Sequence, residues 1–191
     1  SMAVMDKKVK LWDMFKNLGV VFIANLLGAL FIVVLCYLSG LWDTSAGLLG
    51  AYTLNTALTK ATLSPVSALA SGILCNILVC GSILVMTMST DMTGKIWGIF
   101  FTIMAFVVCG FEHSVANMYY LLAGLFAKLN PEYVEVAKAT YHLTNEQIDS
   151  LNILTSLEST FYVSVGNMIG GMVFVSAIFF IIFRKLEKPE H

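Results

Sequence analysis

Long stretches without a charged residue alternate with short polar segments along the 191-residue chain. Charge-free stretches include residues 17–42, 61–90, 96–111, 114–127 and 159–183. A helix that crosses the roughly 30 Å hydrocarbon core of a bilayer needs about 20 apolar residues. The pattern therefore predicts membrane-spanning helices over about residues 18–38, 66–88 and 162–183, with a further apolar region over 96–127.

The apolar region 96–127 is too long for a simple span. A continuous helix over its 32 residues would be about 48 Å long. Its centre carries Gly110, Glu112 and His113. Non-helical backbone is tolerated inside a membrane only where it faces protein or a water-filled cavity. We therefore expect a helix that is broken near 109–114, with two half-helices that meet close to the bilayer midplane.

The composition agrees with a membrane protein. Hydrophobic residues make up 58% of the chain, charged residues make up 12%, and the mean hydropathy is +0.83. A soluble domain carries about 25% charged residues, so a soluble globular domain, a disordered chain and a nucleic-acid binder with a basic face are excluded. We predict an all-α integral membrane protein in which residues 1–191 form one transmembrane domain.

The distribution of basic residues predicts an orientation. Four spans place both chain ends on one side of the membrane, and that side carries eight basic residues: Lys7, Lys8, Lys10, Lys16, Lys95, Arg184, Lys185 and Lys188. The other side carries three: Lys60, Lys128 and Lys138. Because cytoplasmic loops are enriched in Lys and Arg, we expect a cytoplasmic C-terminus in the inner or plasma membrane. Residues 41–64 and 128–158 are then external loops, in which we expect a short helix in the first and some helical character in the second.

Two spans of opposite direction share a short pattern. Asn25 precedes Gly28 and Ala29 in the first span, and Asn167 precedes Gly170 and Gly171 in the last. This shared pattern is typical of an inverted-topology repeat. Its small residues, together with Gly72, predict close helix packing within or between subunits. Since four spans cannot hold two complete three-span repeats, we expect two further spans ahead of this chain.

Glu112, His113 and Asn117 form a polar cluster inside an apolar segment. Ionisable groups within a membrane usually mark function, so His113 is a candidate for a polar station in a permeation path. The alternative is a buried network that ties helices together. We favour the path for His113 and a supporting role for Glu112, because two adjacent residues on a break point in different directions.

The remaining polar residues allow more than one interpretation. Each span carries one asparagine near its middle: Asn25, Asn76, Asn117 and Asn167. Interhelical hydrogen bonding accounts for Asn25, whereas the other three could support the polar centre. Lys60 is the only basic residue of 41–64, and it is either an ordinary solvated lysine or an attractor of anions at a pore mouth. The four cysteines lack metal-ligand spacing and no nucleotide-binding motif occurs, so no metal or cofactor is expected.

The segment CGFEHSVANM at 109–118 resembles the broken-helix motif of the formate/nitrite transporter family. GILCNILVC at 72–80, NLLGA at 25–29 and VGNMIGG at 165–171 are similar to its other helices, in the same order. The resemblance implies an aquaporin-like bundle of six spans, of which four are present here. It also implies a homopentamer with one pore per protomer, which passes formate, nitrite or hydrosulfide.

The resemblance further implies roles for single residues. His113 would be the central pore histidine and Lys60 the lysine of the outer vestibule. Phe106 and Val79 look like apolar constriction residues. The supporting polar network would consist of Glu112, Asn76, Asn117 and Asn167.

We therefore predict a channel or transporter for small monovalent anions of weak acids, not an enzyme. A neutral-solute channel is one alternative, although the paired N-P-A motifs of aquaporins are absent. A membrane enzyme that uses Glu112 and His113 as an acid/base pair is another. Adjacent residues at a helix break do not converge easily on one substrate atom. The sequence does not select among the three anions, and it leaves proton coupling open.

Overall fold

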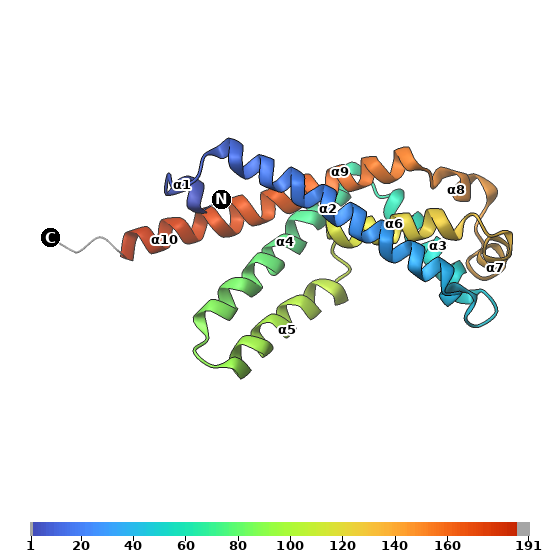
Figure 1. The fold of residues 1–191 in the computed structure, drawn as a ribbon, viewed down its shortest axis with the longest axis horizontal. Helices are drawn as coiled ribbons and strands as arrows, with labels where there is room; N and C mark the ends of the chain where they lie inside the picture. Colours follow the sequence, from blue (N-terminus) through green and yellow to red (C-terminus); the bar gives the residue numbers. More distant parts are fainter. Residues whose placement is uncertain (1, 187–191) are drawn as a thin grey trace. The chain divides into compact units, whose positions relative to one another are not determined.

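A computed structural model describes residues 2–186, with the backbone alone for Met2 and residues 183–186. Within this range every regular element is a helix, as predicted (Figure 1). The elements are α1 (Met2–Met5), α2 (Leu11–Leu38), η1 (Leu41–Asp43), α3 (Leu48–Ala61), α4 (Pro65–Met88), α5 (Met92–Val108), α6 (Ser114–Ala127), α7 (Pro131–Tyr141), α8 (Asn145–Ser150), α9 (Ile153–Ile169), the π-helical η2 (Gly170–Ala177) and α10 (Ile178–Leu186).

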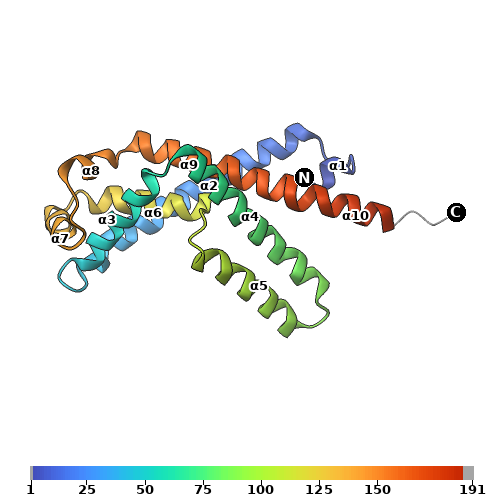
Figure 2. The ribbon, with the colours of Figure 1, turned by 180° about the vertical axis from the view of Figure 1, so that it is seen from behind.

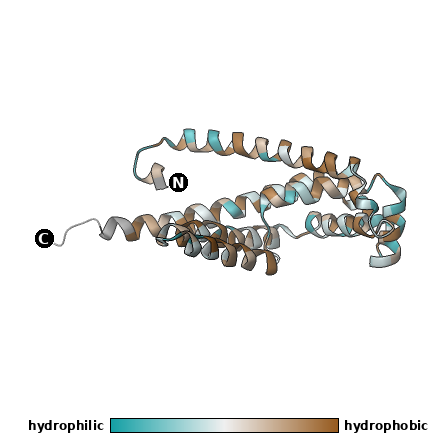
Figure 3. Ribbon diagram, turned by 60° about the horizontal axis from the view of Figure 1, so that its bottom comes forward, coloured by the Kyte–Doolittle hydropathy of each residue, from teal (hydrophilic) through white to brown (hydrophobic). Residues whose placement is uncertain are grey.

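Three stretches of the described chain are long and apolar enough to cross a membrane: Leu11–Leu38, Pro65–Met88 and Ile153–Ile182. Hydrophobic residues cover most of α2, with hydrophilic ones toward its N-terminal end (Figure 3). The apolar helices α5 and α6 are shorter, and residues 109–113 separate them. The predicted break in the region 96–127 is therefore confirmed.

Several helices begin earlier than predicted. Helix α2 begins at Leu11 instead of about residue 18, and α9 begins at Ile153 instead of about 162. The prediction counted charge-free residues, which mark the bilayer core, whereas a helix continues into the polar zone beyond it. Helix α5 begins at Met92 because the Asp91 side chain caps it: the carboxylate accepts a hydrogen bond of 2.8 Å from the N–H of Gly94.

The two segments that were predicted as external loops with some helix are largely helical. Residues 41–64 contain η1 and α3, and residues 128–158 contain α7, α8 and the start of α9. Helix α3 packs closely on α6, since a Cβ atom added to Gly124 would lie 2.0 Å from the Cβ of Ala57. Helix α3 has only 14 residues, so a search for bilayer-length apolar segments misses it.

The chain forms two compact units. The first unit contains Ser1–Gly19, Ala68–His113 and Val163–His191, and the second contains Val20–Ser67 and Ser114–Tyr162. The single channel domain over residues 1–191 stays a prediction.

In the first unit, α4 packs against α9 and η2 through glycines that leave no room for a side chain. A Cβ on Gly72 would lie 2.7 Å from the carbonyl oxygen of Val163, and a Cβ on Gly170 would lie 2.4 Å from that of Ile73. The close packing expected at these glycines is confirmed. In the second unit, Gly28 has nothing within 4 Å of such a Cβ in this chain, so close packing there, within the chain or between subunits, stays a prediction.

In the second unit, α3 lies beside α6 and α7 packs on α3 (Figure 2). Trp42, Leu54 and Tyr133 belong to the buried core. The Tyr133 hydroxyl donates a hydrogen bond to the carboxylate of Asp43, which ties α7 to η1. Burial, and secondly this hydrogen bond, raise the pKa of Tyr133.

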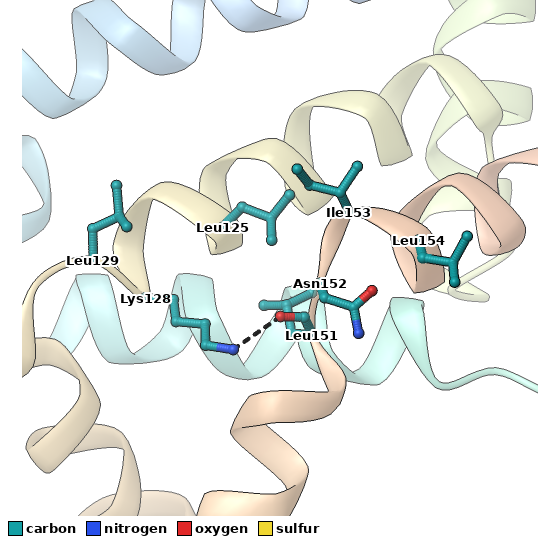
Figure 4. A pocket seen from close by; sticks show the side chains of 7 residues that line it. All are labelled: Leu125, Lys128, Leu129, Leu151, Asn152, Ile153 and Leu154. Carbon is teal, nitrogen blue, oxygen red and sulfur yellow. Dashed lines mark hydrogen bonds between the residues drawn. The ribbon is translucent and has the colours of Figure 1, made fainter.

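Lys128 closes the C-terminal end of α6 within the second unit. Its ammonium donates a hydrogen bond of 3.1 Å to the carbonyl oxygen of Leu151 (Figure 4). The same ammonium lies 3.5 Å from the carboxylate of Asp149. Lys128 borders an open, largely apolar pocket of about 560 Å³. At the edge of that pocket its ammonium interacts with Leu151 and Asp149.

Candidate functional site

The break between α5 and α6 begins with a glycine cap. Gly110 has a φ of +67°, a conformation that glycine adopts at little cost. The N–H of Gly110 bonds to the carbonyl of Val107 at 3.0 Å, and the N–H of Phe111 bonds to that of Phe106 at 3.1 Å. This pair of bonds is a Schellman motif, which satisfies the last carbonyls of α5 and ends the helix.

The backbone of Glu112 is bonded on both sides. Its N–H donates to the hydroxyl of Ser71 on α4 at 3.0 Å, and its carbonyl oxygen accepts from the side-chain amide of Asn167 on α9 at 3.0 Å. We call these two bonds the Glu112 clamp. They replace helical hydrogen bonds that are lost at the break, and non-helical backbone within a membrane needs such partners from the protein.

The asparagines extend this arrangement within the first unit. The Asn167 side-chain amide also donates to the carbonyl of Gly72 at 2.9 Å. The Asn76 side-chain amide in turn donates to the carbonyl oxygen of Asn167. Asn167 and Glu112 are only 7% and 6% exposed. The structure therefore brings together three residues of the predicted polar network: Glu112, Asn76 and Asn167.

His113 is the last residue of the break and is half-buried. Its ring centroid lies 5.9 Å from that of Phe106, with 36° between the ring planes. Val79 lies half-buried on α4, where its carbonyl accepts a hydrogen bond of 2.7 Å from the Ser82 hydroxyl. The first unit thus holds His113 beside the apolar ring of Phe106.

Lys60 and Asn117 belong to the second unit. Asn117 is fully buried on α6. Lys60 lies in the last turn of α3, with its Nζ 5.2 Å from the ring centroid of Tyr120. The carbonyl oxygen of Lys60 accepts a hydrogen bond of 2.7 Å from the Ser159 hydroxyl. Lys60 is therefore more closely held than a freely solvated surface lysine.

Sequence reasoning missed three residues of these arrangements: Ser71, Tyr120 and Ser159. A serine in an apolar helix usually bonds to its own backbone, so nothing singled out Ser71. Its partner Glu112 is 41 positions away along the chain, and only the packing of α4 against the break brings them together. Across the residues that the structure describes, no group of three His, Cys, Asp or Glu side chains could hold a metal ion.

Known proteins resemble this chain along nearly its whole length. The model of the family "Formate/nitrite transporter" matches residues 1–181. The uncharacterized transporter YrhG of Bacillus subtilis is 36% identical over all of this chain and 63% of its own length. The probable formate transporter of Methanothermobacter thermautotrophicus is 30% identical over 96% of this chain and 65% of its own. The formate channel FocA of Escherichia coli is 31% identical over 92% of this chain and 61% of its own. The chain spans less than two thirds of the length of these relatives.

Solved structures share the fold. A pentameric formate channel with formate bound superimposes with a TM-score of 0.79, at 26% identity, over 92% of this chain and 69% of that chain. An FNT family ion channel gives a TM-score of 0.75 at 23% identity, over 94% of this chain and 64% of that chain. The chain is thus a multi-pass membrane protein with a channel fold, and membership in a family of transporters contradicts the membrane-enzyme alternative. On the family model, the relatives and the fold together, the chain belongs to the formate/nitrite transporter family.

Proposed function

We propose that this chain forms part of a membrane channel or transporter for small monovalent anions of weak acids, with formate, nitrite and hydrosulfide as the substrate class. The observation that carries the proposal is the break at 109–113. Its backbone is clamped at Glu112 from two helices, and it ends in His113 beside Phe106. Non-helical backbone inside a membrane is tolerated where it is buried in protein or lines a water-filled cavity, and the ionisable His113 at the end of this break favours a path.

In the proposed mechanism, the apolar side chains of Phe106 and Val79 contribute to the apolar constrictions of the path. An anion loses its hydration there, which costs much free energy, whereas the neutral acid passes with a much smaller loss of hydration free energy. The imidazole of an ordinary histidine titrates at about pH 6.5, so it can give a proton or a hydrogen bond near neutral pH. His113 then neutralises the anion, wholly or transiently, between the constrictions and takes the proton back as the anion leaves.

Lys60 has a separate role in this proposal. Its ammonium attracts anions toward the pore mouth and raises their local concentration. The Tyr120 ring and the Ser159 hydroxyl support it, because they engage the ammonium and the backbone carbonyl of the same residue. We keep Asn117, which is buried on α6, as a proposed member of the supporting polar network.

We infer a homopentamer with one pore per protomer, in the inner or plasma membrane and with a cytoplasmic C-terminus. The similar fold of a pentameric formate channel supports the assembly. The orientation follows from the excess of Lys and Arg on one side of the membrane. Of the basic residues in that count, Arg184, Lys185 and Lys188 lie outside the residues whose side chains the structure describes.

Uptake into proteoliposomes that contain the full-length protein tests this function. Formate, nitrite, hydrosulfide and glycerol are offered in parallel at several pH values, with protein-free liposomes as the control. We expect uptake of at least one anion above the control and none of glycerol. Rapid glycerol uptake without anion uptake would instead support a channel for neutral solutes.

A further inference from the structure

We propose that Ser71 is a positioning residue for His113, because its hydroxyl holds the N–H of Glu112 and thereby fixes the break that presents the histidine. The inference deepens the proposed function and rests on it for its transport consequences. Ser71 itself is argued to act through Glu112 and His113, with no contact to the anion.

The hydroxyl of Ser71 accepts the first backbone N–H that follows the helix cap. The Schellman motif uses the N–H groups of Gly110 and Phe111, which bond back to α5. Glu112 is the next residue, and its N–H bonds to Ser71 Oγ at 3.0 Å. In a bilayer the loss of this acceptor is not made good by bulk water, so the local backbone would move to find another partner.

The two halves of the Glu112 clamp come from different helices. Ser71 on α4 holds the N–H, and Asn167 on α9 holds the carbonyl oxygen. Together they fix the peptide groups on both sides of Glu112. His113 follows directly, so the start of its side chain is set by the same two bonds.

The close packing of α4 against α9 fixes the position of Ser71 relative to α9. Gly72, its neighbour, approaches α9 so closely that a Cβ there would lie 2.7 Å from the Val163 carbonyl oxygen and 3.2 Å from Asn167 Nδ2. The Asn167 amide also bonds to the Gly72 carbonyl at 2.9 Å. The acceptor that Ser71 offers is therefore rigidly placed, which is what a positioning group requires.

Four variants of the full-length protein separate positioning from general structure. Ser71→Ala removes only the hydroxyl, whereas Ser71→Thr keeps it at the same position on α4. The third variant is His113→Ala, and the fourth combines Ser71→Ala with His113→Ala. Size-exclusion chromatography of each variant checks that its assembly matches the parent protein.

The first measurement is hydrogen–deuterium exchange of the segment 106–114 in detergent, which needs no transport. We expect faster exchange in Ser71→Ala and parental exchange in Ser71→Thr. Parental exchange in Ser71→Ala would overturn the inference whether or not the protein conducts anions.

The second measurement is the initial rate of formate uptake and its pH profile. We expect Ser71→Ala to lose about tenfold or more in rate, since small misplacements of a reacting group have effects of this size. Its pH profile should change as well, Ser71→Thr should restore both, and the combined variant should be no slower than His113→Ala. An equal further loss in the His113→Ala background would overturn the positioning role. No uptake by the parent protein, together with faster exchange in Ser71→Ala, would overturn the proposed function and leave the clamp standing.

Discussion

Tyr120 holds the ammonium of Lys60 over its ring at 5.2 Å. If Lys60 attracts anions, the ring improves that role by keeping the charge in one place. Replacement of Tyr120 by Leu removes the ring, and we expect the half-saturating anion concentration to rise about two- to fivefold, because such contacts contribute about 0.5–1 kcal/mol at exposed sites. The maximal uptake rate should change little. Tyr120→Phe keeps a ring and serves as the matched control, and equal effects of the two changes would contradict this role.

Tyr133 predicts a pH dependence of stability. Burial and the hydrogen bond to Asp43 raise its pKa above the ordinary value of about 10. Since the folded pKa lies above the unfolded one, the protonated hydroxyl stabilises the fold fully below pH about 10. That contribution is lost as the pH rises through the higher folded value. Thermal unfolding in detergent between about pH 7 and 11 should show a steeper alkaline loss for the parent than for Tyr133→Phe. The same loss of stability with rising pH in the parent and in Tyr133→Phe would contradict this contribution of Tyr133.

At the scale of elements, the approach of α4 to α9 decides whether the Glu112 clamp exists. A Cβ on Gly166 would lie 2.3 Å from the carbonyl oxygen of Leu69, so the helices must separate to admit it. We expect Gly166→Ala to destabilise the protein by about 1–3 kcal/mol. Gly81 lies on α4 with nothing within 4 Å of an added Cβ, and Gly81→Ala should be neutral or slightly stabilising. Melting temperatures in detergent compare the two, and a similar drop in both would refute the packing argument.

The break between α5 and α6 was predictable, and so was the part of its support that Asn167 and Asn76 provide. The part that Ser71 provides was not. Gly110 and the charged pair after it interrupt an apolar run that is too long for one span, and both facts are local. The hydroxyl of Ser71 and the ring of Tyr120 contact residues that are far away along the chain. No spacing pattern in the sequence therefore predicts these contacts. Helix α3 was expected only as a short helix in a linker, because it is too short to span a bilayer and ends in polar residues. Local patterns thus predict where the chain departs from a helix, and packing decides what holds it there.

At the scale of the whole molecule, the central claim is that small anions pass by His113. Formate uptake by the full-length protein and by His113→Asn, measured between about pH 5 and 8, tests it most directly. Asparagine can still form hydrogen bonds but does not titrate in this range. We expect at least a tenfold loss of uptake and a flattened pH profile, because the proton donor at the middle of the path is gone. Full uptake with an unchanged pH profile in His113→Asn would mean that His113 takes no part in passage of the anion.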